Sequence, residues 1–268
     1  MASIKCRYNG ENGYIFDINN TLTNLEAVKI NGVSISLDDL TYFPEEIDDV
    51  EIVLTNGIVE ANMFYDTETL VSVELNGITY IKEYAFFGCA NLQSVVGLDS
   101  VYDIGESSFR SCPKLTGEIV FGNETHIHSY AFIGTNISSI TFGMQPTIYN
   151  YAFSECSNLS NLVLPDNVRW SDDESYGLGE YGSFAFSDCT GLKSVKIGTN
   201  VSVPYACFSG CTSLESVVWK SGNSLGDYAF QNCKNLKSFF IPEGITQIGT
   251  DDTNYGGTFS GCNSLETL

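Results

Sequence analysis

The chain has 268 residues, of which 43% are hydrophobic, and its 33 Asp and Glu against 12 Lys and Arg give a formal net charge of −21. This composition excludes a wholly disordered chain. The charge argues against binding to nucleic acid or to an anionic membrane surface, because both repel an acidic protein. No apolar run approaches the roughly 20 residues of a spanning helix, so we expect no membrane insertion of this segment.

The first twenty residues contain two short apolar segments, Ser3–Tyr8 and Tyr14–Ile18, on either side of a turn rich in Asn and Gly. Such a pattern predicts a β-hairpin. We expect residues 1–20 to cap the open end of the repeats that follow, because a repeat array needs a covered end to stay soluble. The chain starts without the apolar segment of a signal peptide.

From about residue 21 the sequence repeats with a period of about 22 residues. The clearest copy reads Ala229-Phe230-x-x-Cys233-x-x-Leu236-x-Ser238, followed by Phe239, Phe240 and Ile241. Periods of this length with a Leu-x-x-Leu-x-Leu strand are typical of leucine-rich-repeat solenoids. We expect residues 21–268 to form about ten repeats, the last truncated, as one long curved parallel β-sheet with turns and short 3₁₀ segments on the convex side.

The cysteines follow the repeat. Seven of the nine occupy one position of it, and Cys207 takes the place of the small residue before the Phe. Stacked repeats place equivalent side chains parallel and about 4.8 Å apart, which suits packing better than a disulfide bond. Thr67 and Thr135 take the same position, which a metal site or a disulfide would not tolerate. We therefore expect buried, reduced thiols. The seven are Cys89, Cys112, Cys156, Cys189, Cys211, Cys233 and Cys262.

The full pattern, Ile-Gly-x-x-Ala-Phe-x-x-Cys-x-x-Leu-x-Ser-Val-x-Ile-Pro, resembles the BspA-like leucine-rich-repeat family over about residues 60–268. Ile104-Gly105 matches its opening, Ala229-Phe230-x-x-Cys233-x-x-Leu236 its centre, and Leu162-x-Leu164-Pro165 its strand end. The resemblance implies a cell-surface or secreted protein of a bacterium or protist that binds proteins of a host or neighbouring cell. It implies no catalytic residues.

The strand Leu-x-Ser-Val-x-Ile should turn its Val and Ile into the core and the other positions outward, to the concave surface. The outward position between the Val and the Ile is charged in the first repeats and is largely apolar in the later ones. An exposed apolar row is typical of a contact surface, although valine also simply suits strands. We expect a binding row with Phe240 as its main anchor. Its members are Val96, Val120, Val163, Lys196, Val218 and Phe240, with Ser238 beside them.

Two insertions interrupt the period and share the pattern Asp-Asp-x-x-Tyr-Gly. We expect both to leave the same edge of the solenoid as loops. Acidic loops can hold Ca²⁺, but neither has the alternating spacing of a dedicated calcium loop, so contact with a partner and plain solvated turns remain the alternatives. The candidate residues are Trp170, Asp172, Asp173, Tyr176, Asp251, Asp252 and Tyr255.

The sequence offers little for catalysis. His126 and His128 flank an inward Ile127 and should share one face, but no third metal ligand accompanies them. No nucleophile and base form a recognisable pair, and no Gly-rich phosphate loop opens a helix. We expect no cofactor, no metal and no enzymatic activity.

The leading hypothesis is a non-enzymatic, adhesin-like module that binds a protein or glycan partner through the concave face and the acidic edge loops. The alternative is a structural arm or spacer of a larger surface or virion assembly, with contacts at the ends of the solenoid. The last repeat stops before its strand closes, so we expect the C-terminal end to be covered by further chain or by a partner.

Overall fold

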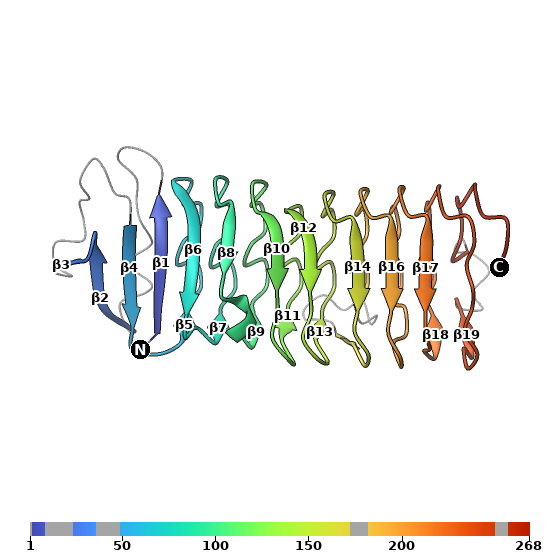
Figure 1. Cartoon of the computed structure of the whole chain (residues 1–268), viewed down its shortest axis with the longest axis horizontal. Helices are drawn as coiled ribbons and strands as arrows, with labels where there is room; N and C mark the ends of the chain where they lie inside the picture. Colours follow the sequence, from blue (N-terminus) through green and yellow to red (C-terminus); the bar gives the residue numbers. More distant parts are fainter. Residues whose placement is uncertain (1, 9–23, 36–48, 172–181, 250–256) are drawn as a thin grey trace.

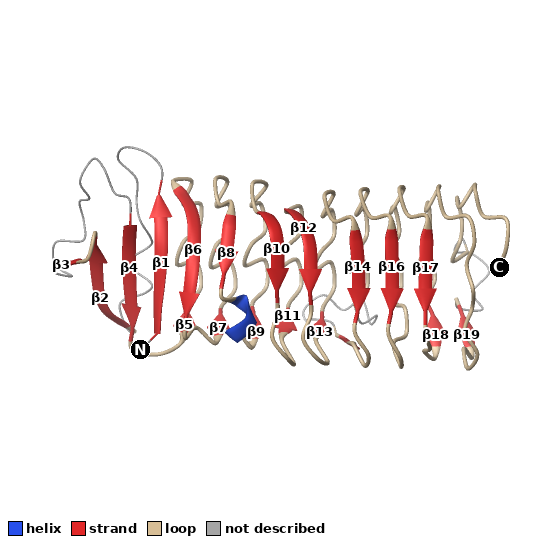
Figure 2. Cartoon of the chain, in the orientation of Figure 1, coloured by secondary structure: helices blue, strands red, loops and turns tan. Residues whose placement is uncertain are grey.

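The computed structural model describes residues 2–8, 24–35, 49–171, 182–249 and 257–268. In these ranges the chain winds as an elongated β-solenoid whose turns stack side by side along the long axis (Figure 1). The described residues hold one helical element, the single 3₁₀ turn η2 (Leu98–Ser100) (Figure 2). The predicted solenoid of parallel strands with almost no helix is confirmed.

The longer strands lie next to one another on one side of the solenoid, and we call their outward side the strand face (Figure 1). Strands β14, β16 and β17 show the rule, since they pair in parallel with equivalent residues opposite each other. From β4 on, these strands are β4 (Asp49–Leu54), β6 (Leu70–Asn76), β8 (Ser94–Val96), β10 (Thr116–Val120), β12 (Asn136–Thr141), β14 (Asn161–Leu164), β16 (Ser194–Ile197) and β17 (Ser216–Trp219).

The predicted single sheet is wrong in one respect, because most turns of the solenoid also contribute a two-residue strand to a second row of parallel sheet, and the turn at Val203 contributes an isolated bridge. The isoleucine that ends a short strand is buried at Ile81, Ile104 and Ile127. The short strands are β5 (Ile58–Val59), β7 (Tyr80–Ile81), β9 (Asp103–Ile104), β11 (His126–Ile127), β13 (Thr147–Ile148), β15 (Arg169–Trp170), β18 (Ser224–Leu225) and β19 (Gln247–Ile248).

The N-terminal strand does not cap the end of the sheet, contrary to expectation. Strand β1 (Ala2–Tyr8) lies between β4 and β6 and pairs antiparallel with both. The outer strands are instead β2 (Leu25–Ile30) and β3 (Val33–Ile35), and β2 runs antiparallel to β4, so residues 25–30 are not a regular repeat strand. The expected second arm of the hairpin, Tyr14–Ile18, lies outside the described residues. Because β4 and β6 both run opposite to β1, they remain parallel to each other.

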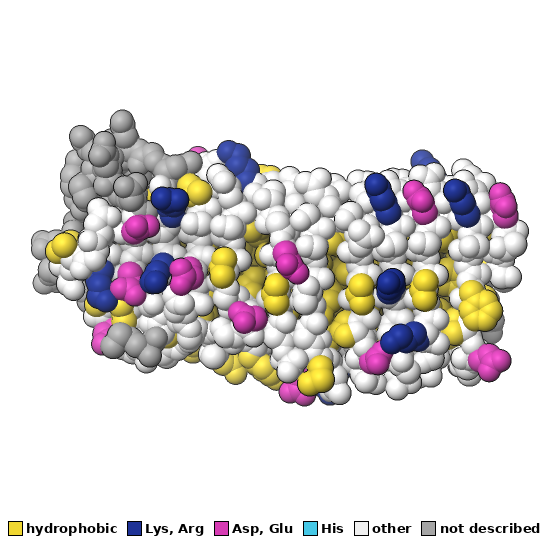
Figure 3. Space-filling model, viewed as in Figure 1, with side chains coloured by type: hydrophobic (Ala, Val, Ile, Leu, Met, Phe, Trp, Pro, Cys, Tyr) yellow, Lys and Arg dark blue, Asp and Glu magenta, His cyan; other side chains and the backbone are white. Residues whose placement is uncertain are grey.

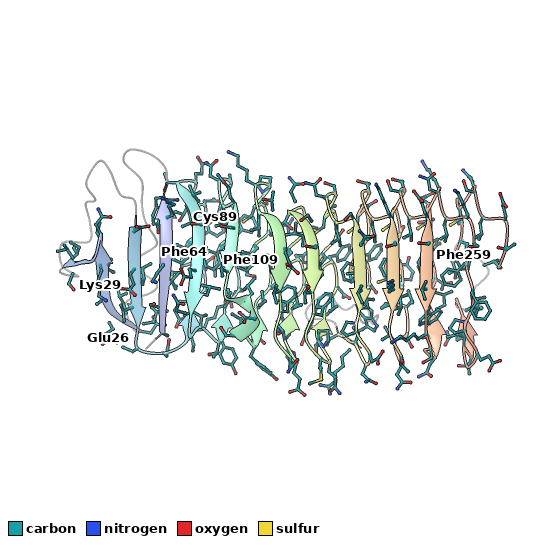
Figure 4. The ribbon with its side chains drawn as sticks, viewed as in Figure 1. Glu26, Lys29, Phe64, Cys89, Phe109 and Phe259 are labelled. Carbon is teal, nitrogen blue, oxygen red and sulfur yellow. The ribbon has the colours of Figure 1, made fainter. Side chains whose placement is uncertain are left out.

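A continuous stack of phenylalanine rings forms the centre of the core. Each ring lies nearly parallel to the next, with centroids 4.8 to 5.8 Å apart. The spacing is close to that of neighbouring strands, because each turn adds one ring. The stack begins at Phe64, which packs on Phe86. Its members are Phe64, Phe86, Phe109, Phe132, Phe153, Phe186, Phe208, Phe230 and Phe259, and Figure 4 labels three of them.

The turn that carries each phenylalanine has an unusual backbone. The residue two positions before it adopts a left-handed conformation even where it is bulky, as in Tyr130 (φ 60°), Tyr151 (φ 57°) and Phe184 (φ 58°). That conformation is unfavourable for L-residues. Hydrogen bonds between turns hold it, for example from Phe132 N to Ala152 O (2.8 Å) and from Tyr151 N to Ser183 O (3.0 Å). The turns therefore form a third, sheet-like ladder of backbone hydrogen bonds.

The cysteine column lies beside the rings, and all nine cysteines are free. Each thiol of the column donates to the carbonyl oxygen of the phenylalanine one turn earlier, as in Cys89 to Phe64 (3.0 Å) and Cys233 to Phe208 (3.2 Å). Thr135 keeps the position polar and bonds to Phe132 O at 2.8 Å. All nine thiols are unbridged, as predicted, and the prediction of burial is confirmed for every cysteine except Cys262, which is half-buried.

Candidate functional site

The strand face presents the apolar row expected from the sequence. The five apolar members are exposed by 43% to 73%, and Phe240 is the most exposed of them. Their neighbours along each strand point inward, so that Val195 and Ile197 are buried on either side of the exposed Lys196. Figure 3 shows yellow side chains following one another across this face. The five apolar residues are Val96, Val120, Val163, Val218 and Phe240.

The other predicted members lie in the same rows. Lys196 stands opposite Val163 on one side and Val218 on the other. Ser238 is exposed and pairs through an isolated parallel bridge with Thr267, so it belongs to the polar row beside the apolar one. The structure thus brings together all seven residues predicted from the strand pattern.

Towards the N-terminus the apolar row continues as a row of paired charges. The register places Lys29 opposite Glu51, Glu51 opposite Lys5, and Lys5 opposite Glu74. Lys29 Nζ lies 2.9 Å from Glu51 Oε2, and Lys5 Nζ lies 3.7 Å from Glu74 Oε1. Sequence reasoning missed Lys5, because only the insertion of β1 between β4 and β6 brings it into the row. These charges satisfy one another, so the unpaired part of the row starts at Val96.

The predicted edge loops are described only at their root. Trp170 is half-buried against the core, and its indole Nε1 donates to Ser202 O at 2.8 Å. Its polar atom is therefore used within the solenoid, between one turn and the next. The remaining loop candidates, Asp172, Asp173, Tyr176, Asp251, Asp252 and Tyr255, lie outside the described residues.

A second exposed feature, the tyrosine–histidine ladder, runs along the short strands and consists of Tyr80, Tyr102, His126, His128 and Tyr149. Ring centroids of neighbours lie 4.2 to 6.3 Å apart. His126 bonds through Nε2 to Tyr102 Oη (3.2 Å) and through Nδ1 to Tyr149 Oη (3.4 Å). His128 Nε2 bonds to an Asp103 carboxylate oxygen at 3.2 Å. Both imidazoles are therefore engaged by neighbours on the outer side of β11.

Partial burial lowers the pKa of His126 below its ordinary value of 6.5. An unfolded chain then binds this proton more readily than the folded one, so the contribution of His126 to stability is lost as the pH falls below about 6.5 and is constant above it. We expect an NMR titration of the His126 ring to give a midpoint below that of a histidine in a short peptide. A midpoint at or above the peptide value would contradict the burial of this ring.

In the described ranges no three His, Cys, Asp or Glu side chains converge as metal ligands. The described part of the chain also holds no helix that is long and apolar enough to cross a bilayer. The candidate functional site of the described residues is therefore a surface, namely the strand face with its exposed apolar row.

Fold and surface together define a parallel β-solenoid built from leucine-rich repeats of about 22 residues. The model of the BspA type leucine-rich repeat region matches residues 35–160 and 125–266, with six copies. The chain belongs to this family. The resemblance expected from the Ala-Phe-x-x-Cys pattern is confirmed.

Three solved structures are similar to the chain. A leucine-rich repeat protein of T. pallidum is 24% identical, with a TM-score of 0.42, over 78% of this chain and 71% of that one. A leucine-rich cell surface protein of Faecalibacterium prausnitzii A2-165 is 18% identical (TM-score 0.36), over 81% and 83%. A leucine-rich repeat protein of Bacteroides ovatus is 18% identical (TM-score 0.33), over 84% of each chain. No curated protein matches the sequence at a significant level.

Proposed function

We propose that the chain is a non-enzymatic, adhesin-like binding module of a cell-surface or secreted protein, and that it captures a protein partner on its strand face. The observation that carries the proposal is the exposed apolar row from Val96 to Phe240. Thr141, opposite Val120, and Lys196 interrupt the row, and exposed apolar side chains gathered along one face are typical of contact sites. Membership of a leucine-rich-repeat family supports a binding role, because solenoids offer extended surfaces on a stacked scaffold.

The row suits binding because its geometry is fixed before a partner arrives. Most of the exposed side chains stand on strands with inward neighbours in the core, as Lys196 stands between Val195 and Ile197, and Phe240 follows the isolated bridge at Ser238. A partner therefore orders few groups of the solenoid when it docks, which limits the entropic cost of association. Phe240 offers a large aromatic anchor beside Val218, and aromatic anchors commonly dominate interface energetics.

The test replaces Val218 and Phe240 with Asp together. We expect this variant to lose binding to partners found by biolayer interferometry on a panel of purified cell-surface and secreted proteins, because two charges then replace the aromatic anchor and the valine beside it. The thermal midpoint should stay unchanged, since both side chains are exposed by more than half. Met144→Asp is the control, because Met144 is a 66% exposed apolar side chain between β12 and β13, away from the row.

Two results would contradict the proposal. The first is an unchanged affinity of the double variant for its partners. That result would favour contacts at the ends of the solenoid, and hence the role of a structural arm. The other is loss of binding in Met144→Asp to the same degree as in the double variant.

A further inference from the structure

The chain segment 193–240, which supplies this end of the strand face, differs in charge from the rest of the sequence. This stretch carries five lysines against two acids, Glu215 and Asp227, in a chain whose net charge is −21. It includes the apolar residues Val218 and Phe240, and on the right of Figure 3 blue side chains alternate with magenta ones around the yellow row. Lysines without an ionic partner on an otherwise acidic protein attract negative groups and steer them to that place.

Most of these lysines have no ionic partner within the solenoid. Only Lys220 forms an ion pair, with Asp166 at 3.4 Å. Among the described residues no carboxylate lies within ion-pair distance of Lys193, Lys196, Lys234 or Lys237. Near the N-terminus the same face has its lysines paired, Lys29 with Glu51 and Lys5 with Glu74. Lys196 is the sharpest case, because its neighbours across the row are Val163 and Val218.

The edge of this surface alternates in sign. Lys193 precedes β16, Glu215 precedes β17, and Lys237 and Glu266 hold the same position in the next two turns. Backbone bonds from Glu215 N to Lys193 O and from Glu266 N to Lys237 O, both 2.9 Å, fix this order. Lys193 and Lys237 are two strand spacings apart, about 9.6 Å. A polyproline II segment repeats its side-chain direction every three residues, about 9.3 Å.

We propose that residues 193–240 dock an extended acidic segment of a protein partner. Its carboxylates, repeated at every third residue, bind Lys196 and the edge lysines Lys193 and Lys237, and its apolar residues contact Val218 and Phe240. Glu215, between the two edge lysines, repels a carboxylate in the intermediate position and so selects this spacing. The inference rests on the proposed function, because it assigns the chemistry of the partner to the same face.

The test uses a fluorescein-labelled peptide of four Glu-Pro-Leu triplets and measures binding to the whole chain by fluorescence anisotropy at low and at physiological salt. We expect saturable binding that weakens with salt, and a loss of about tenfold in affinity for Lys196→Glu. Lys114→Glu is the control with the same change of net charge, and it should alter the affinity less than about twofold, because Lys114 bonds to Asn91 outside this surface.

A matched peptide of Lys-Pro-Leu triplets should not bind. The inference is overturned if the glutamate peptide fails to bind, if both peptides bind equally, or if Lys196→Glu and Lys114→Glu behave alike. It is also overturned if heparin or phosphatidylserine vesicles bind through Lys196 while the peptide does not. If Phe240→Asp abolishes capture of protein partners while Lys196→Glu leaves it intact, the proposed function stands and the acidic partner does not.

Discussion

Replacing Phe153 with Ala is expected to lower the free energy of unfolding by about 3–5 kcal/mol, the usual range for removing a buried phenylalanine. Phe153 is fully buried, and its ring stacks at 5.4 Å on Phe132 and at 5.2 Å on Phe186. Phe121 and Phe142 also meet it edge-on at 5.9 Å. Removing the ring leaves a cavity between two turns, and neighbouring turns are what stabilises each repeat.

The measurement is guanidinium unfolding followed by circular dichroism, with midpoints compared because a long repeat array need not unfold in two states. Phe240→Ala is the matched control. It removes the same ring from a position that is 73% exposed, so we expect the free energy of unfolding to change by no more than about 0.5 kcal/mol. If Phe153→Ala and Phe240→Ala lowered the unfolding midpoint equally, a ring of the stack would contribute no more to stability than a ring on the surface.

The second large effect concerns the thiols. We expect Cys262 to react with iodoacetamide in the folded protein and the other eight cysteines to react only after unfolding. Cys262 is half-buried, whereas the others are buried. Burial raises the pKa of Cys6 to about 12 from 9.0, which lowers its thiolate fraction at neutral pH by about a thousandfold, and the thiolate is the reacting species. Burial likewise raises the pKa of Cys207 and Cys211.

Brief labelling, quenching and mass spectrometry of the peptides would measure the order of reaction. The guanidinium-unfolded chain is the control, in which all nine should react at similar rates. Early labelling of Cys156 or Cys189 in the folded protein would contradict the packing of the column.

The repeat could be predicted from the sequence because identical residues recur at one spacing. Phe230, Cys233 and Leu236 are buried as predicted, and so are their equivalents in the preceding turns. The outward direction of Val218 and Phe240 followed from the alternation of a strand. The alternation of apolar and polar residues does not indicate which other strand a given strand pairs with. Residues 2–8 read correctly as a strand, but nothing in them says that they pair with β4 and β6.

The second sheet escaped prediction for a different reason. A two-residue strand such as β9 is too short to show a period, so its Ile104-Gly105 step was interpreted only as a turn. Gly97 illustrates a constraint that only the structure reveals. Its φ is 95°, and a Cβ there would lie 2.2 Å from the carbonyl oxygen of Leu75. The partners of Trp170 were equally hidden, because Ser202 is a turn away in space and far along the chain.

The place of β1 also sets an order of events during synthesis. Ile4 faces Ile52 on one side and Leu75 on the other. A solenoid can ordinarily grow turn by turn, since each turn needs only its neighbours. Here β1 can pair with β4 only once residue 54 has been made and with β6 only once residue 76 has been made, and closing such long loops is slow. Until β4 and β6 have both been made, the residues Ile4 and Cys6 of β1, which are buried in the finished sheet, remain open to chaperones.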